Sequence, residues 1–131
     1  MPASSFAGAE NYQPAVKAKT ASYTVTIAES GVWFTNRGAT AAITFTLPDT
    51  SKGAVPIGTR YYFFGISATG FTVSTNASST DTIVTKNDAA ADSITCTTTS
   101  LMIGAMVHVI WDGTSWLEQS ASVGPTYTIA T

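Results

Sequence analysis

His108 is the only histidine in the chain, so a catalytic triad would have to be built around it. It lies within the alternating apolar run Met-Val-His-Val-Ile, whereas catalytic residues are disproportionately carried on loops. The sequence contains neither a Gly-x-Ser-x-Gly nucleophile elbow nor a Gly-x-x-x-x-Gly-Lys phosphate loop. One histidine and one cysteine are also too few ligands for a zinc site. We therefore interpret His108 as a packed or interface residue and predict that the protein is not an enzyme.

The acidic side chains are a second source of chemistry, because two carboxylates can hydrolyse a glycosidic bond. They are Glu10, Glu29, Asp49, Asp81, Asp88, Asp92, Asp112 and Glu118. Those that adjoin turn signals are Glu29, Asp49, Asp81 and Asp112. Acidic side chains at such places usually stabilise the backbone by local hydrogen bonds, which is the role that we predict. Asn87, Asp88 and Asp92 offer oxygen ligands for calcium as a weaker alternative, but they lack EF-hand spacing, and we predict no cofactor.

Aromatic residues could instead form a platform on which a sugar stacks. The candidates are Trp33, Tyr61, Tyr62, Trp111 and Trp116. Their positions in alternating runs favour a core role, because each such ring can bury roughly 150–250 Å². The single cysteine, Cys96, lies in a similar run, which favours a buried structural thiol over a nucleophile.

Composition restricts the class of protein. The chain has 131 residues, which fits one domain, and its net charge of −2 argues against nucleic-acid binding. Only 11% of residues are charged, well under the usual quarter, and the mean hydropathy is +0.18. No apolar run approaches the ~20 residues of a membrane span, so we expect part of the apolar surface to be covered by other subunits. The N-terminus lacks a secretory signal pattern, which favours synthesis in a cytoplasm.

The stretch 101–119 is the expected centre of the fold. Its two faces as a strand would carry Ala105, Val107, Val109 and Trp111 on one side and Met106, His108 and Ile110 on the other. Because both faces are largely apolar, we predict a central strand covered on two sides. Asp112-Gly113 predicts a chain reversal, after which Trp116 begins a short return strand.

Shorter alternating runs surround this hairpin. They lie at 22–28, 32–36, 42–47, 59–67, 71–75, 82–85, 93–97 and 126–131. Gly65 within one run indicates a bulge or a close backbone approach, and residues 87–92 are expected to form a loop. No segment has a sustained helical period. The pattern predicts an all-β fold: a compact antiparallel β-sandwich or barrel, jelly-roll-like, with eight to ten short strands.

We expect three parts along the chain. Residues 1–20 would form an extended N-terminal arm, with Phe6, Tyr12 and Val16 as contacts to a partner; a disordered tail is the alternative. Residues 21–122 would form the sandwich or barrel domain, and residues 123–131 a C-terminal tail or edge strand.

The order of several short motifs resembles that of small β-domains in virion proteins of tailed bacteriophages. The motifs are Ser22-Tyr23-Thr24-Val25-Thr26, Glu29-Ser30-Gly31, Gly38-Ala39-Thr40, Phe45-Thr46-Leu47-Pro48, Arg60-Tyr61-Tyr62-Phe63, Asp81-Thr82-Ile83 and Asp112-Gly113-Thr114-Ser115-Trp116. They span roughly residues 22–120. The sequence departs from the pattern at Leu117-Glu118, where two further apolar or aromatic residues would be expected. Proteins of this kind include capsid decoration (cement) proteins and tail-fibre or tailspike modules.

This resemblance implies a homotrimer without catalytic activity. As a decoration protein, the chain would be made in the host bacterial cytoplasm and would bind the major capsid protein at the outer surface of the virion, without nucleic acid or membrane as partners. As a fibre module, it would instead hold a host glycan with loops 48–58, 76–81 and 86–92. The corresponding loop contacts are Asp49, Lys52, Asn76, Lys86 and Asp88.

Overall fold

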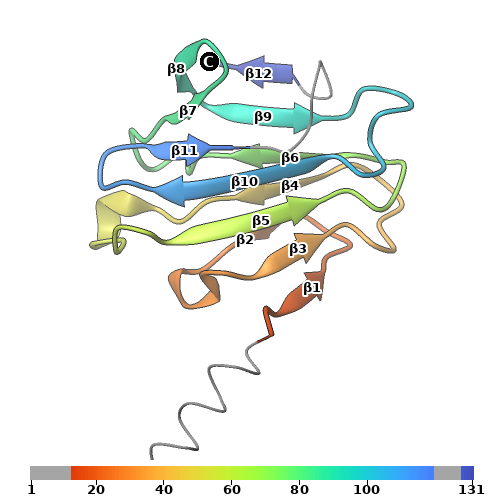
Figure 1. The fold of residues 1–131 in the computed structure, drawn as a ribbon, viewed down its shortest axis with the longest axis horizontal. Helices are drawn as coiled ribbons and strands as arrows, with labels where there is room; N and C mark the ends of the chain where they lie inside the picture. Colours follow the sequence, from red (N-terminus) through yellow and green to blue (C-terminus); the bar gives the residue numbers. More distant parts are fainter. Residues whose placement is uncertain (1–12, 120–127) are drawn as a thin grey trace, which may run out of the picture.

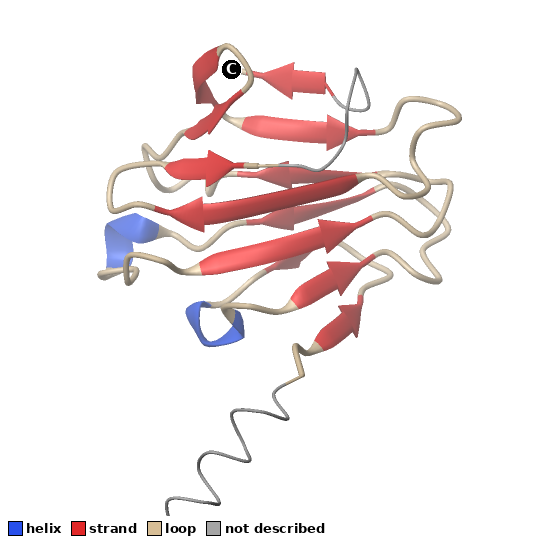
Figure 2. Ribbon diagram, viewed as in Figure 1, coloured by secondary structure: helices blue, strands red, loops and turns tan. Residues whose placement is uncertain are grey.

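The computed structural model describes residues 13–119 and 128–131, which form a β-sandwich of two mixed sheets (Figures 1 and 2). In spatial order, sheet A comprises β1 (Val16–Ala18), β3 (Trp33–Thr35), β5 (Arg60–Phe64), β10 (Met106–Trp111), β11 (Trp116–Glu118), β7 (Ile83–Thr85) and β8 (Asp88–Ala91). Sheet B comprises β12 (Thr128–Ala130), β9 (Ser93–Cys96), β6 (Phe71–Ser74), β4 (Ile43–Thr46) and β2 (Tyr23–Thr24). Two 3-10 turns, η1 (Ile27–Glu29) and η2 (Thr50–Lys52), lie in the connections.

The predicted all-β sandwich is confirmed, but the expected number of strands and their purely antiparallel pairing are wrong. The described residues contain twelve strands, and half of the strand pairings are parallel. The cause is the path of the chain, because the first six strands alternate between the sheets. β1, β3 and β5 enter sheet A, while β2, β4 and β6 enter sheet B. Among these six strands, neighbours in a sheet are therefore two strands apart in the sequence, and they run in the same direction.

The structure also differs from three local predictions. The run at 22–28 does not continue as a strand, because Ile27 begins η1. The expected loop at 87–92 contains β8, which returns beside β7 after Asn87 takes a positive φ of 56°. Residues 16–18 of the expected arm form β1, which pairs in parallel with β3 at the edge of sheet A. At the other end of the chain, β12 is the edge strand of sheet B.

Aromatic side chains from both sheets form the core. Phe34 and Phe63 of sheet A face Phe45 of sheet B, with ring centroids 5.8 and 4.9 Å from that ring. All three are fully buried, as are Val107 and Trp116. Alternation along each strand places these side chains on one side of their sheet. The core therefore lies entirely between the inner faces of the two sheets.

The central hairpin forms where it was expected, although the described strands cover only one of the two faces that were predicted to be covered. β10 is the middle strand of sheet A and pairs antiparallel with β5 and β11. The reversal after β10 is closed by Asp112, whose carboxylate accepts hydrogen bonds from the amides of Thr114 and Ser115 at 2.8 and 2.7 Å, and by Gly113 at φ 97°. These amide bonds hold the pKa of Asp112 below its usual value.

Two buried contacts fix the loops at the end of the sandwich where β5 terminates. Gly65 lies against the backbone of Met102, because a Cβ at this position would be 2.2 Å from that carbonyl oxygen. Asn36 is fully buried and accepts hydrogen bonds from the amides of Ile66 and Ser67 at 2.7 and 2.9 Å. The close backbone approach predicted at Gly65 is confirmed. Among the described residues, no helix is long and apolar enough to cross a membrane.

Candidate interaction surface

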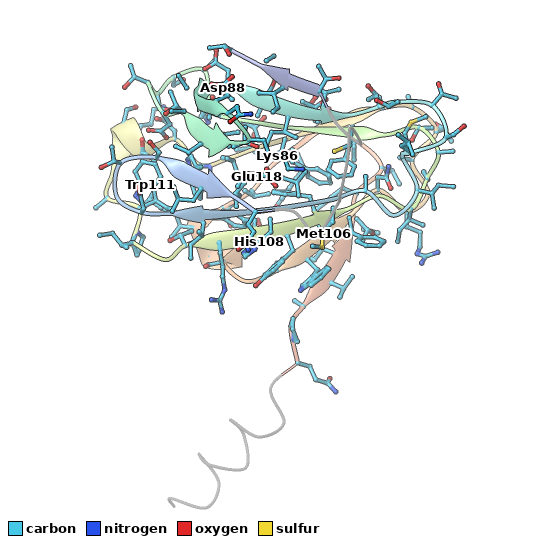
Figure 3. All side chains as sticks on the ribbon, turned by 45° about the horizontal axis from the view of Figure 1, so that its top comes forward. Lys86, Asp88, Met106, His108, Trp111 and Glu118 are labelled. Carbon is cyan, nitrogen blue, oxygen red and sulfur yellow. The ribbon has the colours of Figure 1, made fainter. Side chains whose placement is uncertain are left out.

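The outward side of sheet A carries a band of apolar and aromatic side chains, which we call the outer aromatic face. Its members are Val16, Trp33, Tyr62, Phe64, Met106, His108, Ile110 and Leu117. Val16 is 68% exposed and Leu117 38%, and the other six are half-buried. Figure 3 shows Met106 and His108 on the same side of β10. Every described strand belongs to one of the two sheets, so none of them forms a third layer over this face.

Three flat rings are stacked across the middle of the outer aromatic face. The strand register places Trp33 beside Tyr62 and Tyr62 beside His108. The Trp33 and Tyr62 rings are 4.7 Å apart with 4° between their planes, and the Tyr62 and His108 rings are 4.2 Å apart with 10° between theirs. Val16 continues the same row on β1. The faces of these rings therefore pack against one another.

The setting of His108 lowers the pKa of its ring. Burial lowers the pKa of His108, and the positive charge of Arg60 lowers it further. Its Nε2 atom is buried and makes no hydrogen bond with any residue that the structure describes. A catalytic histidine needs an acid or a nucleophile within hydrogen-bond reach, whereas this ring is held by stacking. The interpretation of His108 as a packed or interface residue therefore agrees with its contacts.

The candidate sugar platform is divided between two environments. Tyr61, Trp111 and Trp116 face the core, and the hydroxyl of Tyr61 donates to the carbonyl of Thr26 at 2.7 Å. Burial raises the pKa of Tyr61, and the negative charge of Glu29 adds to the rise. Trp33 and Tyr62 lie on the outer aromatic face with their planes stacked together. These five rings consequently do not form one open platform.

The outward side of sheet B is chemically different. Its side chains are mainly hydroxyls, in two rows that the strand register aligns: Thr44, Thr72, Thr95 and Thr128, and then Thr24, Thr46, Ser74 and Ser93. Thr72 and Thr95 are hydrogen-bonded to each other at 3.2 Å. Hydroxyl groups can remain hydrated at low cost, whereas the side chains on sheet A leave apolar area in water.

The predicted loop contacts lie in two places. Asp49 accepts from the amide of Ser51 at 2.9 Å and caps η2, which ends at Lys52. Asn76 donates to the carbonyl of Leu47, the residue directly before loop 48–58, at 3.5 Å. Loops 48–58 and 76–81 are therefore adjacent. Lys86 and Asp88 belong to the separate β7–β8 hairpin.

A depression of about 380 Å³ lies beside the first two loops. Thr50 and Asp81 line it and are hydrogen-bonded to each other at 2.6 Å, while the largely buried Trp111 forms part of its wall. Asp92 lines a neighbouring depression with Asn76. Polar groups thus gather at this end of the sandwich, although Asp88 is engaged elsewhere, accepting from Ala90 and Thr131.

Other predicted site residues have structural settings. Cys96 is fully buried, and burial raises the pKa of its thiol to about 12. Glu29, the last residue of η1, is buried, and it accepts a hydrogen bond from the amide of Thr26 at 2.9 Å, which is the kind of local bond predicted for it, and another from the ammonium of Lys17 at 2.8 Å. The described residues contain no group of three or more histidine, cysteine or acidic side chains placed to hold a metal ion.

Of the arm residues, only Val16 falls within the described part of the chain; Phe6 and Tyr12 lie outside it. The sequence analysis did not propose Phe64, Met106, Ile110 or Leu117 as contacts. The signal was the apolar second face of the 59–67 and 101–119 stretches, which predicted cover on both faces without identifying the contact residues.

No protein-family model matches this chain, and no curated protein matches it.

Proposed function

We propose that this chain is a structural virion protein, a capsid decoration (cement) protein that binds the outer surface of a bacteriophage capsid as a homotrimer. The outer aromatic face is the observation that carries the proposal. A half-exposed row of three stacked rings, flanked by Met106 and Ile110, is apolar surface that a soluble protein normally covers. The order of the sequence motifs, which resembles that of virion β-domains, supports a capsid protein as the partner.

The proposed mechanism is passive. Association buries apolar area, at roughly 25 cal/mol per Å², and the trimer clamps neighbouring copies of the major capsid protein against the pressure of packaged DNA. The part of residues 1–20 that precedes β1 would reach over the shell, with Phe6 and Tyr12 as anchors, while β1 itself lies at the edge of sheet A.

The chemistry of the described residues supports a binding role over catalysis. The single histidine is stacked against Tyr62, the single cysteine is buried, and Asp49 and Asp112 are engaged in turns. A protein of this kind would be synthesised in the host bacterial cytoplasm and would end at the virion surface, with neither nucleic acid nor membrane as its partner.

Co-sedimentation tests this function. Capsids from a phage strain that lacks the coding sequence would be incubated with the purified chain and pelleted, and the bound protein would be quantified. We expect saturable binding in multiples of three copies and greater resistance of the shells to heat. Deletion of residues 1–12, which leaves β1 in place, should weaken binding. Shells that pellet without the full-length protein at saturating concentration would refute the proposal.

A second candidate is a tail-fibre or tailspike module that binds host glycan. The observation in its favour is that loops 48–58 and 76–81 lie next to each other, beside the depression lined by Thr50 and Asp81. Oligosaccharides of the host surface would be titrated against the chain and its Asp81→Asn variant. This function predicts saturable binding that the substitution weakens at least tenfold, with Asp92→Asn as the control at the neighbouring depression.

A further inference from the structure

β5 and β10 are apolar on both faces, but the described chain covers only one of them. Their inner side chains, such as Phe63 and Val107, are fully buried against sheet B. Their outer side chains, such as Tyr62, Phe64 and Ile110, remain half-exposed. A strand with two apolar faces is characteristic of a sheet covered on both sides. The second cover must therefore come from outside the described part of the chain.

We propose that the outer aromatic face is the surface through which copies of this chain pack against one another, with the Trp33–Tyr62–His108 stack at its centre. The inference rests on the proposed homotrimer and adds to it the surface that holds the copies together. The hydroxyl-covered side of sheet B then remains directed to water.

The charge of the surface favours a second copy as its occupant. Across the three rows of the outer aromatic face, Arg60 is the charged residue, aligned with Ile110, and no described acidic side chain lies among these rows. A strongly acidic or basic partner would lose hydration across the whole face, where Arg60 is the one charged side chain among the described rows. A largely apolar face is complementary to another such face, and an identical copy supplies one.

The size of the surface fits the centre of an interface. The face crosses β1, β3, β5, β10 and β11. At ~4.8 Å between strands and ~3.4 Å per residue over the five residues from 106 to 110, it measures roughly 19 by 14 Å, or about 270 Å² in projection. A stable complex buries about 800 Å² on each partner, with an apolar centre and a polar rim. The face supplies that centre, and the surrounding loops would supply the rim.

The stacked rings suit this role for a further reason. Each ring of the stack is already fixed by its neighbours at 4.2 and 4.7 Å. Packing against a second copy would therefore cost little additional side-chain entropy, which is one of the main costs of association. Aromatic anchors in a neutral setting are also the residues that most often carry interface energy.

Two charge-introducing variants test the inference as a matched pair. Ile110→Asp places a carboxylate on the outer aromatic face, and Thr44→Asp places one at a half-buried position on the outward side of sheet B. Molar mass would be measured by light scattering and sedimentation over a hundredfold range of concentration. We expect the mass of three chains for the wild type and for Thr44→Asp, and a threefold lower mass for Ile110→Asp. An unchanged mass for Ile110→Asp, or a wild type that stays at one chain throughout, would overturn the inference.

A thiol-accessibility measurement covers the case in which Ile110→Asp fails to fold. Leu117→Cys lies on the outer aromatic face and Thr24→Cys lies on sheet B, and both positions are exposed in the single chain. The native Cys96 is buried and would not react. We expect the labelling rate at position 117 to fall at least tenfold as the protein is concentrated, while the rate at position 24 stays constant. Equal rates at all concentrations would contradict the inference.

Capsid binding of the same samples separates this inference from the proposed function. If the wild type forms a trimer that Ile110→Asp dissociates, but this trimer does not bind shells, the inference stands and the decoration role is refuted. Shell binding by an Ile110→Asp variant that keeps the mass of three chains would refute the inference and leave the decoration role standing.

Discussion

Replacement of Glu29 by glutamine is the substitution whose effect the structure predicts in most detail. The carboxylate is only 8% exposed. It accepts hydrogen bonds from the ammonium of Lys17 and the hydroxyl of Tyr23, each at 2.8 Å, and from the amide of Thr26 at 2.9 Å. Glutamine has nearly the same shape but no charge, and its amide group would face donors. The substitution therefore tests the charge rather than the packing.

The magnitude follows from the acidity of the group. Burial raises the pKa of Glu29, but the hydrogen bonds from Lys17, Thr26 and Tyr23 outweigh it and lower the pKa from 4.5 to about 2. A difference of this size corresponds to about 3 kcal/mol of stability. Because the pKa of the folded state is lowered, this stability is fully present above pH 4.5 and is lost as the pH falls toward 2. About half of it should remain at pH 3.

Urea unfolding followed by tryptophan fluorescence would measure the effect, since Trp116 is fully buried in the core. We expect Glu29→Gln to lower the free energy of unfolding by about 3 kcal/mol at pH 7 and by about half as much at pH 3. Asp92→Asn is the matched control, because Asp92 is exposed and its hydrogen bonds to Thr75 and Ala130 come from its backbone. An equal loss at pH 7 and pH 3 would show that the charge of Glu29 does not matter.

Three further outcomes are expected. Gly65→Ala should lower the free energy of unfolding by at least about 2 kcal/mol, because the new Cβ would be 2.2 Å from the Met102 carbonyl; Gly53→Ala, with open space around it, is the control in the same denaturation assay. Asn36→Ala should cost about 2–4 kcal/mol by leaving two buried amides without their acceptor, and an unchanged midpoint would contradict this. Cys96 should not react with a thiol reagent at pH 8 in the folded protein and should react fully in urea, since burial raises its pKa to about 12.

The faces of the strands could be predicted from the sequence, and their neighbours could not. Alternation places Val107 and His108 on opposite sides of their strand in any all-β fold, because successive side chains point to opposite sides, and the structure shows Val107 on the buried side. The sheet to which a strand belongs depends on where the chain crosses the sandwich. Connections as short as the one between β3 and β4 do not reveal in sequence whether they form a hairpin or cross to the other sheet. The parallel pairings were missed for this reason.

Local composition explains the two misassigned segments. β8 consists of Asp-Ala-Ala-Ala, a sequence with low strand propensity, and is held in place by its pairing with β7. Ile27 follows a clean alternating run, yet the chain turns there because Glu29 closes a capping box with Thr26. In both cases a tertiary or capping contact decides the conformation against the local pattern.

The candidate surface could likewise be predicted from the sequence only in part. Apolar residues at alternate positions of β10 indicated that both faces needed cover, and the structure shows the described chain covering one. The stacking of Trp33, Tyr62 and His108 joins residues 29 and 46 positions apart, and it requires the register of β3, β5 and β10. No pattern within a single segment contains that information.

Glu29 and the outer aromatic face are linked through β1. This strand has three residues, all exposed, so little burial holds it to the sheet. Its attachment depends on backbone bonds, such as that from the amide of Lys19 to the carbonyl of Thr35 at 2.9 Å, and on the ion pair between Lys17 and Glu29. Val16, at the end of the ring row, moves with β1. Protonation of Glu29 would therefore loosen the edge of the outer aromatic face before the core unfolds, and the surface proposed to join the copies would lose its outermost strand first.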